Sequence, residues 1–258
     1  MLKELYTAAL GMVPQQTRLE VLSNNIANAN TVGFKRESAF ERSLISAQGN
    51  LNNTKGDVEQ DDTPTDTFTD YAQGATERTG NQFDFAIDGK KGYFTVEDRD
   101  GNQYLTRAGH FTLGSDGKIQ TPDGLTLLGE NGAIIVQQQM GGNAIDDTKA
   151  LTLSVKENGD VFVNNQTVGR IQLTDVENPQ TLQRETGSHF STTDETITTP
   201  IAQTDVSIKQ GYVENSNVNI IKEMVEMIEL QRMFEMGQKV ITTNDGTLDR
   251  SIDVGRFG

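Results

Sequence analysis

The stretch NQFDFAIDGKKGYFTVEDRDGNQYLTRAGHFTLGSDGKIQTPDG, residues 81–124, decides the fold of the middle of the chain. Short runs of alternating apolar and polar residues are each closed by a glycine-containing turn pair, a pattern typical of antiparallel β-strands. Such pairs suit the positive φ angles of tight hairpin turns, and we expect them at Asp88-Gly89, Asp100-Gly101, Asp116-Gly117, Asp123-Gly124, Asn131-Gly132 and Asn158-Gly159. The pattern continues to about residue 176 and predicts a central antiparallel β domain, a barrel or a sandwich.

The two ends of the chain follow a different pattern, with apolar residues spaced by three and four positions as in amphipathic helices. Within residues 1–34 this seam consists of Leu2, Leu5, Ala9, Met12, Leu19 and Ile26. Within residues 212–252 it consists of Ile220, Met224, Met227, Leu230, Phe234, Ile241 and Leu248. Pro14 removes a backbone hydrogen bond from the first helix, at about 3 kcal/mol where unrelieved, so we expect a kink or break near Leu10 to Val13.

Neither terminal helix is expected to be stable alone, because isolated helices in water are marginal unless they bury an apolar face. We therefore predict an α+β fold class, with long N- and C-terminal helices packed as a coiled-coil-like stalk and a central antiparallel β domain. Three domains are predicted. Residues 1–45 together with 208–258 form a helical assembly domain. Residues 46–80 form an extended linker or arm, and residues 81–207 form a β-rich outer domain. Two alternatives stay open: the helices cover each other within one chain, or neighbouring copies cover them.

The composition excludes several functional classes. Of the 258 residues, 34% are hydrophobic and 6% aromatic, which is a thin core for this length. The formal charge of −15 would repel a phosphate backbone, so nucleic acid is not an expected partner. Without cysteine, the chain has no disulfide, thiolate metal site or cysteine nucleophile. No run approaches the roughly 18 apolar residues that span a bilayer, so no membrane insertion is expected.

The N-terminus imitates a signal peptide. Lys3, the apolar run Leu5 to Val13 and the small residues of Ala27-Asn28-Ala29 have the order of a cleavable signal. Charged residues interrupt the region that should be purely apolar, namely Glu4, Arg18 and Glu20. We expect that the chain, if exported, leaves the cytoplasm uncleaved.

No constellation of side chains predicts catalysis, a cofactor or a metal site. His110 and His189 lack a helical partner four residues away and are interpreted as surface or packing residues. The segment Asp98-Arg99-Asp100-Gly101-Asn102 begins like a calcium loop, but Gly109 stands where such a loop needs a bidentate Glu. We interpret it as a hairpin turn. The sequence therefore predicts a protein that is not an enzyme.

Segments from both ends and from the middle carry a family resemblance. They are SNNIANANTVGFKR (Ser23–Arg36), then TGNQFDFAIDGKKGYFTV and YLTRAGHFTLGSDGKIQTPDG, then QGYVENSNVNIIKEMVEMIELQRMFEM (Gln210–Met236). In this order they resemble the flagellar axial proteins, the rod and hook family of the bacterial flagellum. The length and single β domain resemble a basal-body rod protein of the FlgF/FlgG type rather than a hook protein. The short 46–80 segment and the ending RMFEMGQKVITTNDGTLDR favour a FlgF-like proximal over a FlgG-like distal subunit.

The resemblance implies a structural subunit that polymerises through its terminal helices into part of the drive shaft that transmits torque. Helices of many copies would form inner tubes, and β domains the outer wall. The implied partners are other copies of the chain, other rod and hook subunits, and the flagellar type III export apparatus. The implied location is the basal-body rod crossing the periplasm. The alternatives are a hook-type axial protein and a secreted β-rich binding module whose helices form a private stalk.

Matching positions imply an assembly interface at both ends. At the N-terminal end, the apolar seam would consist of Leu2, Leu5, Met12, Leu19 and Ile26. The amides that fix its register would be Asn24, Asn25 and Asn28. Gly33 and Phe34 would turn the chain out of the tube. At the C-terminal end, the residues where the chain re-enters the tube would be Gln210, Gly211, Asn217 and Asn219. The returning helix would contribute Ile220, Met224, Met227, Leu230, Phe234, Ile241 and Leu248.

Overall fold

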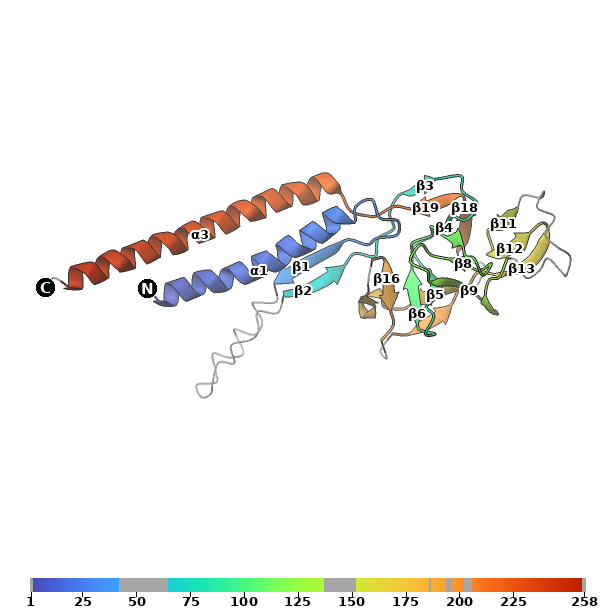
Figure 1. Cartoon of the computed structure of the whole chain (residues 1–258), viewed down its shortest axis with the longest axis horizontal. Coiled ribbons are helices and arrows are strands. Elements are labelled where there is room, and N and C mark those ends of the chain that lie inside the picture. Colours follow the sequence, from blue (N-terminus) through green and yellow to red (C-terminus); the bar gives the residue numbers. More distant parts are fainter. Residues whose placement is uncertain are drawn as a thin grey trace. The chain divides into compact units, whose positions relative to one another are not determined.

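The computed structural model describes residues 2–41, 65–136, 152–185, 187–193, 196–201 and 206–256. The chain divides into two compact units, which are described separately below (Figure 1). The helical unit comprises Met1–Ala27, Glu37–Asp70 and Asn219–Gly258. The β unit comprises Asn28–Arg36 and Tyr71–Val218.

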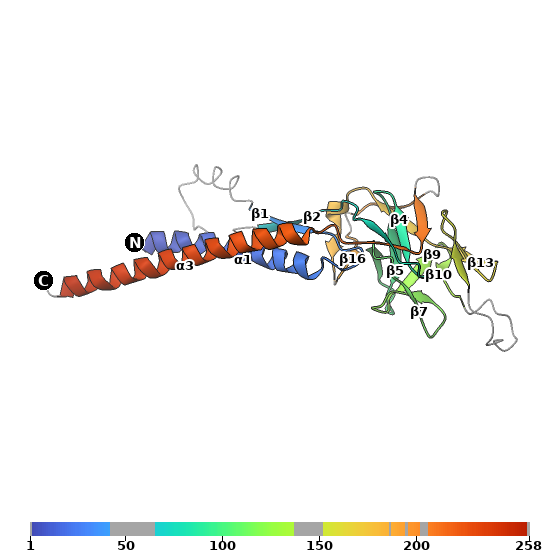
Figure 2. The same ribbon diagram turned by 90° about the horizontal axis from the view of Figure 1, so that it is seen from above.

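The helical unit contains two helices and a two-stranded ribbon. Helix α1 (Leu2–Ala27) lies beside helix α3 (Ile220–Arg256), as both views show (Figures 1 and 2). Strands β1 (Glu37–Glu41) and β2 (Thr65–Thr69) pair antiparallel, and β1 packs against α1. The Oδ1 atom of Asn219 accepts the backbone N–H of Lys222 at 3.1 Å and so caps the start of α3.

Helix α1 runs without a break through Pro14. Of the predicted kink or break near Leu10 to Val13, the break is therefore wrong. Pro14 is buried, so the contacts of its ring offset part of the lost backbone hydrogen bond.

The β unit is built from antiparallel strand pairs. Its largest sheet has ten strands, in the order β15-β16-β6-β5-β9-β8-β7 with β10, β14 and β17 attached beside this path. The strands of this sheet are β5 (Tyr93–Glu97), β6 (Gln103–Thr106), β7 (Thr112–Leu113), β8 (Ile119–Gln120), β9 (Thr126–Gly129), β10 (Gly132–Ala133), β14 (Leu173–Val176), β15 (Gln183–Arg184), β16 (His189–Ser191) and β17 (Thr198–Pro200).

Smaller sheets complete the β unit, with a short 3-10 helix at Pro179–Thr181. One has three strands, β11 (Leu153–Val155), β12 (Asp160–Val163) and β13 (Gln166–Arg170). Two have two strands each: β18 (Ser207–Gln210) with β4 (Phe85–Asp88), and β19 (Tyr212–Glu214) with β3 (Thr76–Arg78). Strands β3 and β2 fall within the segment expected as a linker, whose residues 46–64 lie outside the described part of the chain.

The hairpin turns lie where the sequence places them. All six glycines of the Asp-Gly and Asn-Gly pairs adopt positive φ, at Gly89, Gly101, Gly117, Gly124, Gly132 and Gly159. This prediction is confirmed. The turns fix the register in which the strands bring their apolar residues to one side.

The core of the β unit is centred on three phenylalanines. The ring of Phe111 lies 5.5 Å from that of Phe94, edge to face, and 5.8 Å from that of Phe85. Aliphatic side chains from β5 itself and from five further strands enclose them, including Val96, Ile119, Leu127, Val155, Val161 and Ile208. Each such side chain contributes about 1.5–3 kcal/mol when fully buried.

The predicted fold class is wrong. Among the described residues the model contains two α-helices and nineteen strands, so the fold is mostly β-sheet and not an α+β fold built on a helical stalk. Helix α1 ends at Ala27, and α3 begins only at Ile220. A coiled coil buries the apolar residues of its seam, whereas Met224 of α3 is 51% exposed and its neighbour Glu223 is fully buried. The helices lie side by side without forming a coiled-coil stalk.

A buried ion cluster ties the segment 28–36 to the rest of the β unit. Lys35 Nζ lies 2.5 Å from Glu214 Oε1, and Arg107 Nη1 lies 3.2 Å from Glu214 Oε2. Lys35 also donates to the carbonyl of Ala72 at 2.9 Å, and the backbone N–H of Gly74 donates to Glu214 Oε1 at 3.1 Å. A buried charge is stable only when paired and hydrogen-bonded, and Glu214 is the carboxylate that both of these cations face.

Replacing Glu214 by Gln should destabilise the β unit. The substitution keeps the shape of the side chain but removes the negative charge of residue 214 that Lys35 and Arg107 face. We expect the free energy of unfolding to fall by about 3–5 kcal/mol. Urea denaturation of the full chain followed by circular dichroism measures it.

The matched control is Glu157→Gln, at an exposed position of the same unit, which should change the free energy by less than about 0.5 kcal/mol. Equal effects of the two substitutions would contradict a structural role for the cluster.

Candidate assembly surface

Helix α1 contributes a buried patch near its C-terminal end. Val21, Leu22 and Asn25 are buried, while Leu19 and Ile26 of the predicted seam are half-buried. The side chains of Leu2, Leu5 and Met12 lie outside the described residues, although their backbone belongs to α1. The described part of this helix therefore covers much of its apolar surface within the chain.

Asn25 holds α1 to the other elements of the helical unit. Its Oδ1 accepts the backbone N–H of Glu37 at 2.9 Å, and its Nδ2 donates to the Glu37 carbonyl at 2.7 Å. The same Nδ2 lies 3.0 Å from Glu223 Oε2 on α3. One fully buried amide thus fixes the position of β1 and α3 against α1. The predicted neighbours Asn24 and Asn28 are exposed and half-buried, respectively.

The side of α3 that faces α1 contains four residues of the predicted seam and differs from the prediction in the first turn of the helix. Leu230 is buried, and Met227, Phe234 and Ile241 are half-buried, as members of one face. Glu223, spaced four residues before Met227, completes this face. The predicted members Ile220 and Met224 are exposed, and the side chain of Leu248 lies outside the described residues. Hydrophobic periodicity misses Glu223 because its partner, Asn25, is on a distant part of the sequence.

The remainder of α3 presents apolar side chains to solvent. They are 42–76% exposed and consist of Ile221, Met224, Val225, Ile228, Met233, Met236 and Val240. At 3.6 residues per turn five of them lie about 120° or more around the helix axis from Leu230, and Met233 and Val240 lie on the adjoining flank, about 60° and 80° from it. We call these seven residues the outward face. A contiguous exposed apolar patch of this kind marks an interaction site in a protein that folds in water.

A groove lies between the two helices. It has a volume of about 660 Å³ and is lined by Gln15, Gln16 and Leu19 of α1 and Leu230, Gln231, Phe234 and Glu235 of α3. Leucine and phenylalanine side chains provide its apolar floor, and glutamine amides its polar rim. We refer to this site as the groove.

The other predicted interface residues contact their own chain in the β unit. Gln210 donates from Nε2 to the carbonyls of Gln82 and Leu153, at 2.8 and 2.9 Å. Asn217 accepts the backbone N–H of Arg36 at 2.7 Å and donates to the Ala72 carbonyl at 3.1 Å. The structure therefore places these two amides as internal braces.

The turn at Gly33 and Phe34 is packed tightly against the β unit. Gly33 has φ of +70°, and a Cβ atom there would lie 2.2 Å from the backbone nitrogen of Ala108. Phe34 is 1% exposed, and the guanidinium of Arg184 stacks 4.4 Å from its ring centroid. Gly211 is likewise buried, with φ of +77°. These positions favour glycine and an aromatic residue for the internal packing of the unit.

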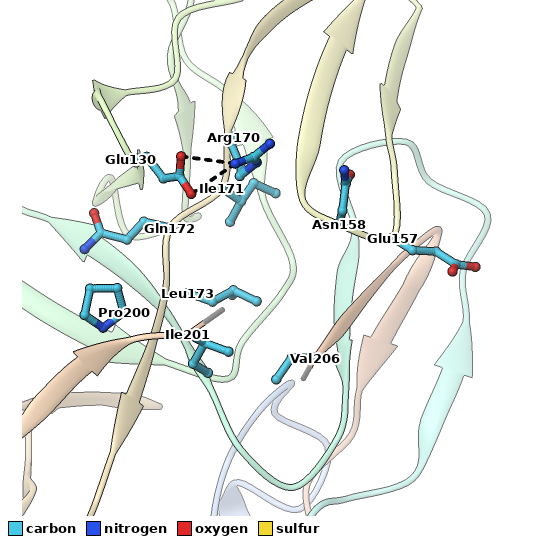
Figure 3. A pocket seen from close by; sticks show the side chains of 10 residues that line it. All are labelled: Glu130, Glu157, Asn158, Arg170, Ile171, Gln172, Leu173, Pro200, Ile201 and Val206. Carbon is cyan, nitrogen blue, oxygen red and sulfur yellow. Dashed lines mark hydrogen bonds and ion pairs between the residues drawn. The ribbon is translucent and has the colours of Figure 1, made fainter. Parts of the chain in front are cut away.

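The described residues of the β unit enclose smaller hollows, the larger one of about 370 Å³ and lined by Asp98, Tyr104 and His189 among others. Figure 3 shows a cavity of about 40 Å³ beside the Glu130–Arg170 ion pair, little more than the roughly 30 Å³ share of one liquid water molecule. The hydrogen bond from Arg170 at 2.7 Å holds the pKa of Asp160 below its usual value.

The supposed calcium loop is a turn. Asp98 Oδ1 accepts the backbone N–H groups of Asp100 and Asn102 at 2.8 and 3.0 Å, and its Oδ2 accepts from Asn102 Nδ2 at 2.9 Å. These hydrogen bonds, the Asn102 amide foremost, lower the pKa of Asp98 and confirm the hairpin interpretation. In the part of the chain that the structure describes, no three His, Asp or Glu side chains cluster as metal ligands would. None of its helices has the length and apolarity needed to cross a bilayer.

Comparison with known proteins gives matches along the chain. Residues 5–35 match the family described as flagella basal body rod protein, and residues 86–163 match the flagellar hook protein FlgE/F/G D1 domain. Residues 209–254 match the flagellar basal body rod FlgEFG protein C-terminal family. The three matches cover the same regions as the resemblance seen in the sequence.

Whole-length relatives agree with these matches. The chain is 32% identical over 278 residues to the flagellar basal-body rod protein FlgG of Bacillus subtilis, covering 99% of this chain and 100% of that protein. It is 35% identical to the FlgG protein of Caulobacter vibrioides, over 96% and 97% of the two chains. It is 31% identical to the flagellar basal-body rod protein FlgF of Rhizobium meliloti, over 96% of each. The predicted resemblance is confirmed, and the chain belongs to the family of flagellar basal-body rod proteins.

Proposed function

We propose that the chain is a structural subunit of the flagellar rod that polymerises through its helical unit and performs no catalysis. The observation that carries this proposal is the outward face of α3, which stays exposed when the chain is alone. Burial of apolar surface contributes about 25 cal/mol per Å², so covering this face stabilises an assembly. Family membership supports the same role.

The main alternative is a secreted β-rich binding module whose two helices pack only against each other, as a stalk within one chain. Such a stalk would cover the apolar residues of α3 within its own chain. Only one side of α3 is covered in this way, around Leu230, while Ile221 on the other side is 76% exposed. The exposed side therefore favours contacts between chains.

The proposed partners are other copies of the chain and other rod and hook subunits. Family membership supports both, and it supports a position in the basal body. We further propose that the flagellar type III apparatus exports the chain without signal cleavage. In the rod, many helix contacts loaded together would transmit torque, since each closely packed contact resists deformation.

For the position within the rod, we propose a proximal subunit of the FlgF type. The short 46–80 segment and the ending RMFEMGQKVITTNDGTLDR support it. Relatives with the names FlgG and FlgF match the chain at nearly equal identity, so the position needs its own experiment.

The assembly proposal predicts that Ile228→Asp abolishes motility while the isolated chain still folds. Ile228 is 50% exposed in the single chain, so the new carboxylate stays hydrated there. In a rod the same carboxylate would be buried without a partner, which is strongly unfavourable. Swimming assays and circular dichroism of the purified chain measure the two effects.

The matched control is Gln238→Asp, an equal change in charge at an exposed polar position of α3 outside the outward face. We expect this variant to swim. Normal swimming of the Ile228→Asp strain would count against the outward face as an assembly surface.

The positional proposal predicts that the chain stays in basal bodies purified from a strain without the distal rod subunit. A proximal subunit is added first and does not need the distal one. Mass spectrometry of those particles detects it. Its absence there, together with its presence in wild-type particles, would exclude the proximal position.

A further inference from the structure

We propose that the groove of one copy receives the N-terminal half of the outward face from α3 of a neighbouring copy. This contact rests on the proposed function and specifies it, since it names the two surfaces that meet. The docking segment consists of Ile221, Val225 and Ile228, which are spaced as i, i+4 and i+7 along one side of α3. That spacing is how an amphipathic helix lays its apolar side into an apolar groove.

The groove has the chemistry to accept such a helix. Leu19, Leu230 and Phe234 line it with apolar surface, and its volume of about 660 Å³ leaves room for inserted side chains. The amides of Gln15, Gln16 and Gln231 stand at the same site and supply donors and acceptors for the polar edges of an incoming helix. An apolar centre with a polar rim is the usual anatomy of a protein interface.

Charges on the two surfaces are complementary. The groove carries Glu235 in its lining, and the exposed Glu20 lies close by on α1, where it accepts a hydrogen bond from Gln16 at 3.3 Å. The docking side of α3 continues into Arg232, Glu235 and Lys239, all exposed, so its cations outnumber its carboxylate there. Opposite charges at facing surfaces fix orientation and speed encounter, and they matter here because a net charge of −15 otherwise makes copies repel.

The groove is therefore filled by a second copy of the chain. The docking segment and the groove residues of α3 belong to successive turns of one continuous helix, so a chain cannot place its own docking segment in its own groove. Each copy therefore offers one groove and one docking segment to different neighbours. Contacts between two unlike surfaces repeat without limit when the rotation does not close, and they generate an open helical polymer.

Disulfide cross-linking tests this contact directly, because the natural chain has no cysteine. The variant carries Gln16→Cys in the groove and Val225→Cys in the docking segment. Basal bodies from cells that produce it are oxidised and analysed by non-reducing electrophoresis. We expect dimers and longer multiples of the chain, because each copy has one thiol for the neighbour on either side.

The two single-cysteine variants are the controls and should give no multiples, since each lacks one partner of the bond. Double-variant chains that are present in the basal bodies but form no multiples would overturn the contact. Cross-linking only to a different protein would also overturn it, since another subunit would then fill the groove. Absence of the unmodified chain from wild-type basal bodies would instead refute the proposed rod function.

Discussion

The helical unit depends on one imbalance: α3 has apolar residues on more than one side, whereas α1 covers only the side around Leu230. Leu230 is buried on the covered side, and Ile221 and Met236 are 76% and 61% exposed on the other. A helix this apolar gains stability from every surface that removes it from water. Among the described residues, α3 therefore keeps apolar surface that a further molecule can bury.

The β unit supplies the opposite property, a closed and well-paired interior. Glu214 joins Lys35 and Arg107, and Asn217 braces Arg36 and Ala72. These contacts hold residues 28–36, the segment that follows α1, against the sheets. A subunit with an internally satisfied β unit and an unsatisfied helical unit is suited to a rod, because assembly buries new surface without rearranging the part that is already folded.

The features of this structure that depend on neighbouring residues in the sequence could be predicted. Those that depend on contacts between distant parts of the sequence could not. The Asp-Gly and Asn-Gly turns were predictable because positive φ is a property of the residue pair itself. Most described members of the predicted α3 seam lie on the covered face, but Glu223 was missed, because it is buried by a contact with Asn25, which lies 198 residues earlier. The fold class was predicted wrongly because the two terminal helices were weighted too heavily against the nineteen strands of the described residues. The Glu214 cluster joins residues up to 179 positions apart and leaves no local pattern.

The most direct test of the central claim is the alkylation rate of a thiol on the outward face. In the variant Met236→Cys this thiol is the only one in the chain, because the natural sequence has no cysteine. A maleimide reagent should label it rapidly in the purified monomer, where position 236 is exposed, and slowly in intact basal bodies, where a neighbour covers it. Equal rates in the two states would contradict the account, since the outward face would then stay open to solvent in the assembled rod.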